Sequence, residues 1–173
     1  MMCVAALLWL ACICACATGG PPIVNSAAVP MARQAELRMI FDRVATANTA
    51  DAEAAASELA AVNADEWAYV DALWGTRSDS PLTARRMGAA SLARPERKSQ
   101  AVLWYRRALK MIDAEKGYLA AAEVRLELAR ALHANGDTRG AVELLANRVD
   151  PRPLSADLAA RYEAMLNEIA SAK

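Results

Sequence analysis

Apolar residues recur along the chain at the spacing of an α-helix. Between positions 30 and 44 they follow an i, i+3, i+4, i+7 order: Leu37, Ile40, Phe41 and Val44. This order puts them on one face of a helix, with charged and amide side chains on the other faces. A second helix is predicted over about 51–62, because that stretch begins with acidic residues, which the helix dipole favours, and continues with an alanine-rich face.

A third, shorter helix is predicted after these two. Asp65 can cap its start, and Gly75 suits a left-handed stop at its end. Trp67, Val70 and Trp74 share one face of this helix. We therefore expect the two tryptophans to belong to the core.

Two stretches forty positions apart, 85–109 and 125–149, predict two copies of one helix–turn–helix unit. Ala101 and Ala141 occupy the same place in the second helix of each copy, where a small residue lets two helices approach closely. Neither copy can bury its apolar face alone. Repetition at this period is typical of a stack in which each helix pair covers its neighbour.

Helix start signals mark the limits of the two repeats. We predict the repeats over about 81–113 and 120–153. Ser80 followed by Pro81 combines a cap with a proline in the first turn. A final helix over 155–171 begins at Ser155. Its apolar stripe, which we expect to close the stack, consists of Leu158, Tyr162, Met165 and Ile169.

Composition favours an all-α fold, and the repeats make it a short helical-repeat solenoid. Of the 173 residues, 55% are apolar but only 5% are aromatic, so strand formers are scarce while helix formers are plentiful. The length suits one domain. Twenty basic residues balance twenty acidic ones, so no overall field attracts nucleic acid, and we expect no nucleic-acid partner.

The second copy resembles the tetratricopeptide repeat and the related Sel-one-like repeat over residues 123–153. The matching positions of the two helices, the turn and the closing proline are Leu128, Ala129, Leu132, Gly136, Ala141, Leu145 and Pro153. Arg148 departs from the pattern, because the family prefers alanine there. The first copy resembles the Sel-one-like version in the run from Gln100 to Ala108, although its turn at 93–96 lacks the family's glycine.

In such repeats the first helices of successive copies line a concave groove that binds a segment of a partner protein. The resemblance places on this groove Ala90 and the candidate binding residues Arg86, Arg94, Glu123, Leu126, Arg130 and His133. The three arginines would make it mildly basic and suited to an acidic segment. The alternative is an ordinary solvated face.

The N-terminus predicts an export signal. Residues 1–17 are apolar and uncharged, and Ile13-Cys14-Ala15-Cys16 resembles a bacterial lipoprotein box. That resemblance implies a signal peptide over 1–15 and a lipid on Cys16, followed by a flexible tether over 16–29 and a helical domain over 30–173. No Lys or Arg precedes the apolar run, so the alternative is translation from Met31 and a cytoplasmic protein.

Few residues in this chain suit catalysis or metal binding. All four cysteines lie within the first sixteen residues, and the single histidine, His133, is expected at a helix C-terminus, where the dipole favours it. No nucleophile elbow or phosphate-binding glycine loop is present. We expect no catalytic residue, metal, cofactor or small-molecule substrate. A third possibility, an enzyme of unrecognised type, would require paired, buried polar residues in a cleft.

Together these features predict a non-enzymatic lipoprotein that acts as a protein-interaction scaffold. Lipoproteins with such repeats serve as assembly factors for export or secretion complexes, so the resemblance implies partner proteins in the cell envelope. Ala17 after the lipid-bearing cysteine, where aspartate would favour the inner membrane, implies the outer membrane, with the domain facing the periplasm.

Overall fold

The computed structural model describes residues 29–46, 48–74, 80–112, 116–147, 150 and 152–172. Within these ranges the chain forms eight α-helices, one 3-10 helix and no strand. They are α1 (Met31–Val44), α2 (Thr49–Ala60), α3 (Ala64–Leu73), α4 (Pro81–Leu92), η3 (Pro95–Arg97), α5 (Lys98–Met111), α6 (Tyr118–Ala134), α7 (Thr138–Ala146) and α8 (Ala156–Ser171). The predicted all-α class is therefore confirmed for these residues.

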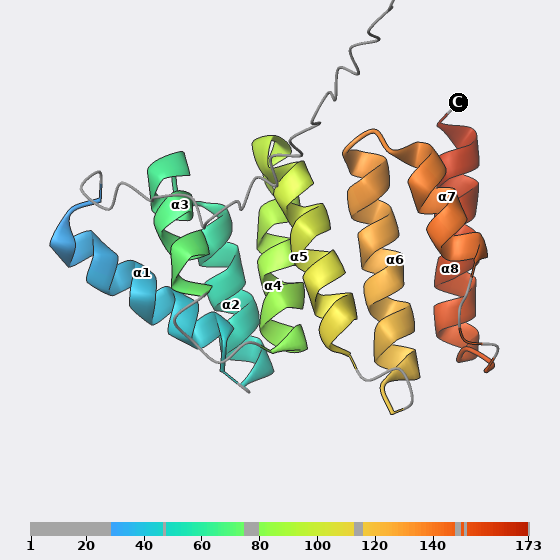
Figure 1. Ribbon diagram of the computed structural model, residues 1–173, viewed down its shortest axis with the longest axis horizontal. Coiled ribbons are helices and arrows are strands. Elements are labelled where there is room, and N and C mark those ends of the chain that lie inside the picture. Colours follow the sequence, from blue (N-terminus) through green and yellow to red (C-terminus); the bar gives the residue numbers. More distant parts are fainter. Residues whose placement is uncertain are drawn as a thin grey trace, which may run out of the picture.

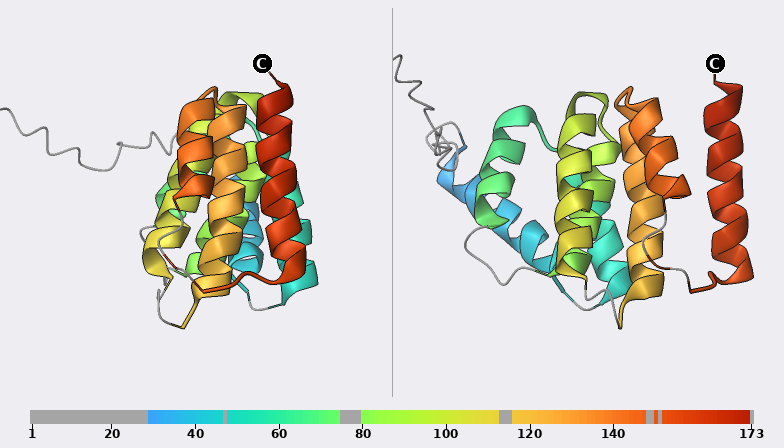
Figure 2. Two further views of the ribbon diagram at one scale, coloured as in Figure 1. Left: turned by 90° about the vertical axis from the view of Figure 1, so that its right-hand side faces the viewer. Right: turned by 45° about the vertical axis from the view of Figure 1, so that its right-hand side comes forward.

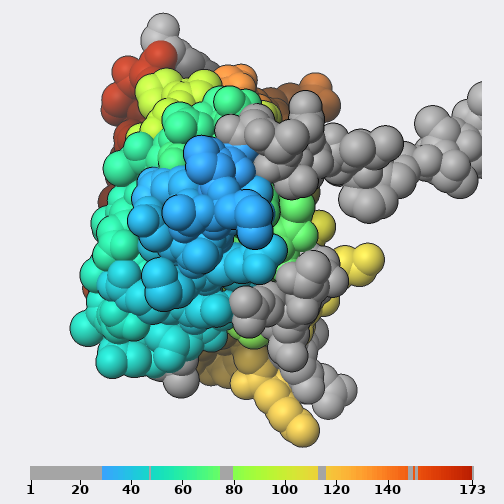
Figure 3. Space-filling model, turned by 90° about the vertical axis from the view of Figure 1, so that its left-hand side faces the viewer, coloured from blue at the N-terminus to red at the C-terminus, as the bar shows by residue number. Residues whose placement is uncertain are grey.

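Helix α1 lies at one end of the long axis of the molecule, and α7 and α8 lie at the other (Figure 1). Between them α3 lies on the α1 side of α2, and α4, α5 and α6 follow in chain order. Consecutive helices from α4 to α7 pack against each other, and α8 packs on both α6 and α7 (Figure 2). At the opposite end α1 packs on α2 and α3, and its surface covers much of that end (Figure 3). Helix α2 contacts α4, which connects the N-terminal helices to the rest.

Side-chain caps start several helices, as the sequence predicted for α4 at Ser80 and for α8 at Ser155. For α3 the predicted cap was wrong. Asn63 caps this helix, and Asp65 already lies in its first turn. Asn63 Oδ1 accepts a hydrogen bond from Glu66 N at 3.0 Å, and Glu66 Oε2 accepts one from Asn63 N at 2.9 Å. These reciprocal bonds satisfy two backbone donors, which Asp65 could not do from inside the helix.

The core runs continuously through the helices. Trp67 is fully buried and Trp74 is 6% exposed, so both tryptophans belong to the core as predicted. Ala101 and Ala141 are also fully buried. All four residues of the predicted α8 stripe are buried, and Gly136 has a φ of 89° in the α6–α7 turn, which favours glycine.

The predicted signal peptide, Cys16, Gly75 and Arg148 lie outside the described residues. Val29, the last residue of the predicted tether, does not belong to a tether, because it is 4% exposed and its carbonyl accepts a hydrogen bond from Gln34 Nε2 at 2.8 Å. Among the helices that the structure describes, none has both the length and the apolar character needed to cross a membrane.

Candidate functional site

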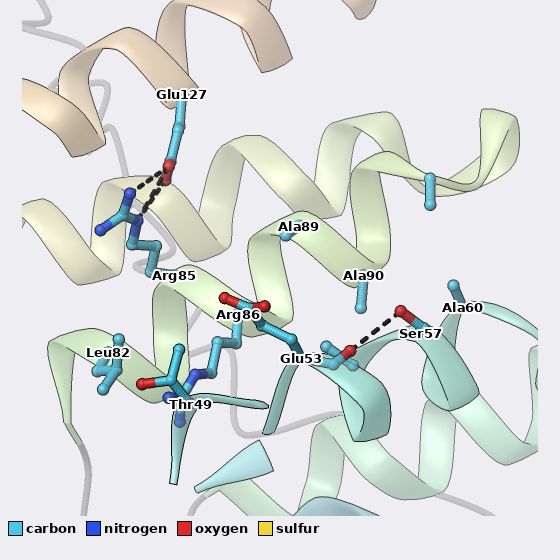
Figure 4. Close-up of a pocket in the computed structure, with 12 residues that line it drawn as sticks. Thr49, Glu53, Ser57, Ala60, Leu82, Arg85, Arg86, Ala89, Ala90 and Glu127 are labelled. Atoms are coloured by element: carbon cyan, nitrogen blue, oxygen red, sulfur yellow. Dashed lines mark hydrogen bonds and ion pairs between the residues drawn. The ribbon is translucent and has the colours of Figure 1, made fainter. Parts of the chain in front are cut away.

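A solvent-open groove of about 530 Å³ lies between α2, α4 and α6 (Figure 4). We call it the α2–α4–α6 groove. Its apolar lining is dominated by alanines from α2 and from α4 and its C-terminal end: Ala56, Ala60, Ala89, Ala90 and Ala93. Alanine-rich faces let helix backbones approach and leave space above them that larger side chains would fill. Alanines therefore form most of the apolar surface of the groove.

One rim of the groove is an ion-pair cluster that joins α4 to α6. Arg85 Nη2 donates to Glu127 Oε1 at 2.6 Å, and Arg85 Nη1 donates to Glu123 Oε2 at 2.9 Å. These bonds, the one to Glu127 above all, raise the pKa of Arg85 above its ordinary value. Arg85 and Glu127 line the groove, and Glu123 adjoins them, so this cluster has two carboxylates for one guanidinium. Glu53 and Ser57 line the groove from α2 (Figure 4).

Arg86 lines the groove but is not the exposed cation that the sequence predicted. It is 6% exposed, and its Nη1 donates to the carbonyl oxygens of Val44 at 2.8 Å and Thr46 at 2.6 Å. Burial lowers the pKa of Arg86 below its ordinary value. Its side chain thus satisfies carbonyls at the C-terminal end of α1, which otherwise lack partners. The expectation of an exposed groove arginine is wrong at this position.

Arg94 binds carbonyl oxygens at the C-terminal end of α2, as Arg86 does at the end of α1. Its Nη1 donates to the carbonyl oxygens of Ala60 at 3.0 Å and Val62 at 2.8 Å, at the C-terminal end of α2. Its Nε donates to Glu96 Oε1 at 2.6 Å. Arg94 does not line the groove. Two of the three predicted groove arginines therefore hold helix ends.

The candidates on α6 occupy four different environments. Leu126 is fully buried, so its predicted exposure is wrong, because it belongs to the core. Glu123 is half-buried and bonded to Arg85. Arg130 is exposed, and His133 is half-buried with Nδ1 3.3 Å from Thr138 Oγ1. The six predicted residues do not form one binding wall, and whether any of them binds a partner stays a prediction.

Sequence reasoning missed the groove's actual rim. The predicted repeats align Arg85 with Arg125, forty positions later, as equivalent positions of two repeats. That alignment does not consider contacts between the repeats, and in the structure Arg85 bonds to Glu127, 42 positions away. Opposite charges at Arg85 and Glu127 were the available signal. In the described ranges, no three His, Cys, Asp or Glu side chains come together to hold a metal ion.

No protein-family model, curated protein or solved structure matches this chain. The resemblance to tetratricopeptide and Sel-one-like repeats therefore stays a prediction that rests on the residues themselves. The geometry of the groove and the chemistry of the N-terminal segment are what support a function.

Proposed function

We propose that this protein is a non-enzymatic scaffold that is lipid-anchored to a bacterial outer membrane and faces the periplasm. In this proposal its helices form a short tetratricopeptide-like or Sel-one-like solenoid that holds a protein of an export or secretion complex. The observation that carries the proposal is the α2–α4–α6 groove, which combines an open alanine floor with charged rims. A segment of a partner can lay small or apolar side chains on the floor and polar groups along the rims.

The packing order of the helices supports the solenoid. The α4–α5 pair is followed by the α6–α7 pair, with α5 against α6 between them. Helix α8 then covers the last pair, and its Tyr162 hydroxyl donates to the Ala122 carbonyl at 2.7 Å. A terminal helix that hides the apolar face of the last unit is what a repeat stack requires.

The groove is tested by cross-linking from position 89. Ala89 is exposed and lines the groove, whereas Ala160 is exposed on α8 and does not line it. A photo-activatable amino acid at 89 should cross-link one recurrent envelope protein in intact cells, and the same group at 160 should not. Ala89→Trp, which fills the groove, should abolish the retention of that protein. Identical cross-links from both positions would contradict a role for the groove.

The anchor is tested separately, at Cys16. Metabolic labelling with a palmitate analogue should mark the wild-type protein and leave Cys16→Ser unlabelled. Equal labelling of both would exclude lipid attachment at this residue. Membrane fractions separated by density should then contain the labelled protein with the outer membrane.

The alternative, a cytoplasmic adaptor translated from Met31, would lack part of the N-terminal packing of the domain. Such a chain lacks Val29, which is buried in the core, and Pro30, which stands at the N-cap of α1. Losing a buried valine removes about 1.5–3 kcal/mol of burial free energy. A chain that starts at Met31 should therefore melt lower than one that starts before Val29, and recovery of the native protein in the soluble fraction would favour the adaptor.

A further inference from the structure

The outward face of α5 carries positive charge that no carboxylate of the described residues matches with an ion pair. Helix α5 contains no acidic residue and four cationic ones: Lys98, Arg106, Arg107 and Lys110. The last three are exposed and share one face with Leu103, which is 55% exposed. We call Leu103, Arg106, Arg107 and Lys110 the α5 strip.

Arginines elsewhere in the described ranges mostly meet carboxylates. Such pairs are Arg33 with Glu66, Arg43 with Asp51, Arg85 with Glu127, Arg97 with Asp71, and Arg139 with Glu143. None of the three cations of the α5 strip forms an ion pair with a described carboxylate. Asp71 lies near enough to Arg107 to interact with its charge, but both oxygens of Asp71 accept bonds from Arg97 Nη2 at 3.0 Å. The charge of the strip is therefore available to a partner.

Two tryptophans hold Arg107 in place. Its guanidinium carbon lies 5.1 Å from the centroid of the Trp74 ring and 4.8 Å from that of Trp104. The two rings themselves pack edge to face, with centroids 4.8 Å apart. Stacking on aromatic rings restricts the guanidinium while its in-plane N–H groups remain available for a carboxylate. An arginine ordered in this way loses less conformational entropy when it binds an anion.

We infer that the α5 strip docks an acidic segment of a partner protein, whose carboxylates meet Arg106, Arg107 and Lys110 while an apolar side chain covers Leu103. Charge complementarity and the ordered Arg107 carry this choice of occupant. A membrane surface fits less well, because membrane-binding helices insert a broad apolar face. Here Leu103 is the single exposed apolar side chain of the strip, and Trp74 and Trp104 are only 6% and 5% exposed.

The α5 strip is a second surface, beyond the proposed function. No α5 residue lines the α2–α4–α6 groove, so the strip leaves that groove free for another segment. It also does not depend on lipid at Cys16. Failure of the experiment below leaves the cross-linking from position 89 and the labelling of Cys16 unaffected, and the reverse also holds.

The test uses a fluorescein-labelled 16-residue peptide of alternating glutamate and leucine, and the same peptide with glutamine for glutamate. Fluorescence anisotropy with the purified chain should show that the acidic peptide binds and the glutamine peptide does not. The variant Leu103→Ser/Arg106→Gln/Lys110→Gln should weaken binding by at least about tenfold, since it removes two charges and the apolar contact. Arg107 is kept, because its contacts with the tryptophans would be lost.

The matched control is Arg139→Gln/Val142→Ser/Arg161→Gln, which removes the same charge and a similar exposed apolar side chain from α7 and α8. It should bind the peptide like the wild type. Equal weakening by both variants would overturn the inference in favour of general electrostatics, and absence of binding to the wild type would overturn it outright.

Two further measurements identify a different occupant. Co-sedimentation with phosphatidylglycerol vesicles that the α5 variant abolishes, while peptide binding stays intact, would replace the protein segment with a membrane surface. Light scattering that shows a wild-type dimer and a monomeric α5 variant would replace it with a second copy of the chain. Either result overturns the inference as stated.

Discussion

The α4–α5 pair and the α6–α7 pair share a helical register but differ in how they connect to the rest of the molecule. Ala101 and Ala141, forty positions apart, are both fully buried, so each pair has a small core residue at this position. Arg86 and Leu126 also correspond, and both are buried, yet one binds carbonyl oxygens of another helix while the other is an apolar core residue.

The difference follows from the neighbours of each pair. The α4–α5 pair adjoins the ends of α1 and α2, whose last carbonyls need donors, and Arg86 and Arg94 supply them. The α6–α7 pair adjoins α8, which presents an apolar stripe. The residues forty positions after Arg86 and Arg94 are Leu126 and Ala134. The positions that bind the ends of α1 and α2 are thus polar in the α4–α5 pair, and the positions forty residues later are apolar.

Substitution of Arg86 should have the largest effect on stability. Arg86→Ala should lower the free energy of unfolding by about 2–4 kcal/mol, because it removes the donor of one buried and one part-buried carbonyl and creates a cavity. Arg86→Leu, which installs the residue of the second pair, should cost less because it fills the space. Chemical denaturation of both variants measures this difference. A variant Arg86→Ala as stable as the wild type would show that the junction does not need these bonds.

A second test replaces the contact between Gly88 of α4 and Tyr105 of α5 with the residues found in the α6–α7 pair. A Cβ atom on Gly88 would lie 2.9 Å from the ring of Tyr105, so Gly88→Leu should cost about 1–3 kcal/mol by overpacking. The second pair has leucine at both corresponding positions, Leu128 and Leu145. Adding Tyr105→Leu should recover part of the loss, which a double-mutant cycle would quantify. Strict additivity of the two changes would show that the positions do not couple.

A third test asks whether the shared alanines are equivalent. Ala101→Leu and Ala141→Leu should each cost about 1–3 kcal/mol, since both sites are fully buried. The exposed residue Glu143 serves as control, where Glu143→Ala should change stability by less than about 0.5 kcal/mol. Thermal melts decide the outcome. If Ala141→Leu has the same melting temperature as the wild type, the alignment of the two pairs is incorrect in α7.

The smallest expected effects on stability are those of replacing Arg94 and Arg130. Arg94→Ala should cost about 1–2 kcal/mol, because its guanidinium holds carbonyls at the end of α2. Arg130→Ala should change the free energy of unfolding by less than about 0.5 kcal/mol, since the residue is exposed and lacks a described ion pair. Urea titrations of both variants at one ionic strength provide the comparison. A larger loss for Arg130→Ala would reverse the assignment of roles.

The sequence by itself determined the helices, their register and most of the core. Periodicity and caps depend on residues within a few positions of each other, so Ser80, Ser155 and the α8 stripe could be recognised locally. The error at Asp65 was also local, because Glu66 stands three residues after Asn63 and completes a capping box, whereas Asp65 is followed at that spacing by Ala68.

Only the tertiary structure decided what the cations do. Arg86 bonds to carbonyls 40 and 42 positions away, Arg94 to carbonyls 32 and 34 positions away, and Arg85 to carboxylates on α6. A long, flexible guanidinium takes whichever acceptor the packed helices bring near, and its sequence neighbours do not specify that acceptor. For the same reason the unpaired charge of α5 could be identified only once the positions of the carboxylates on its neighbours were known.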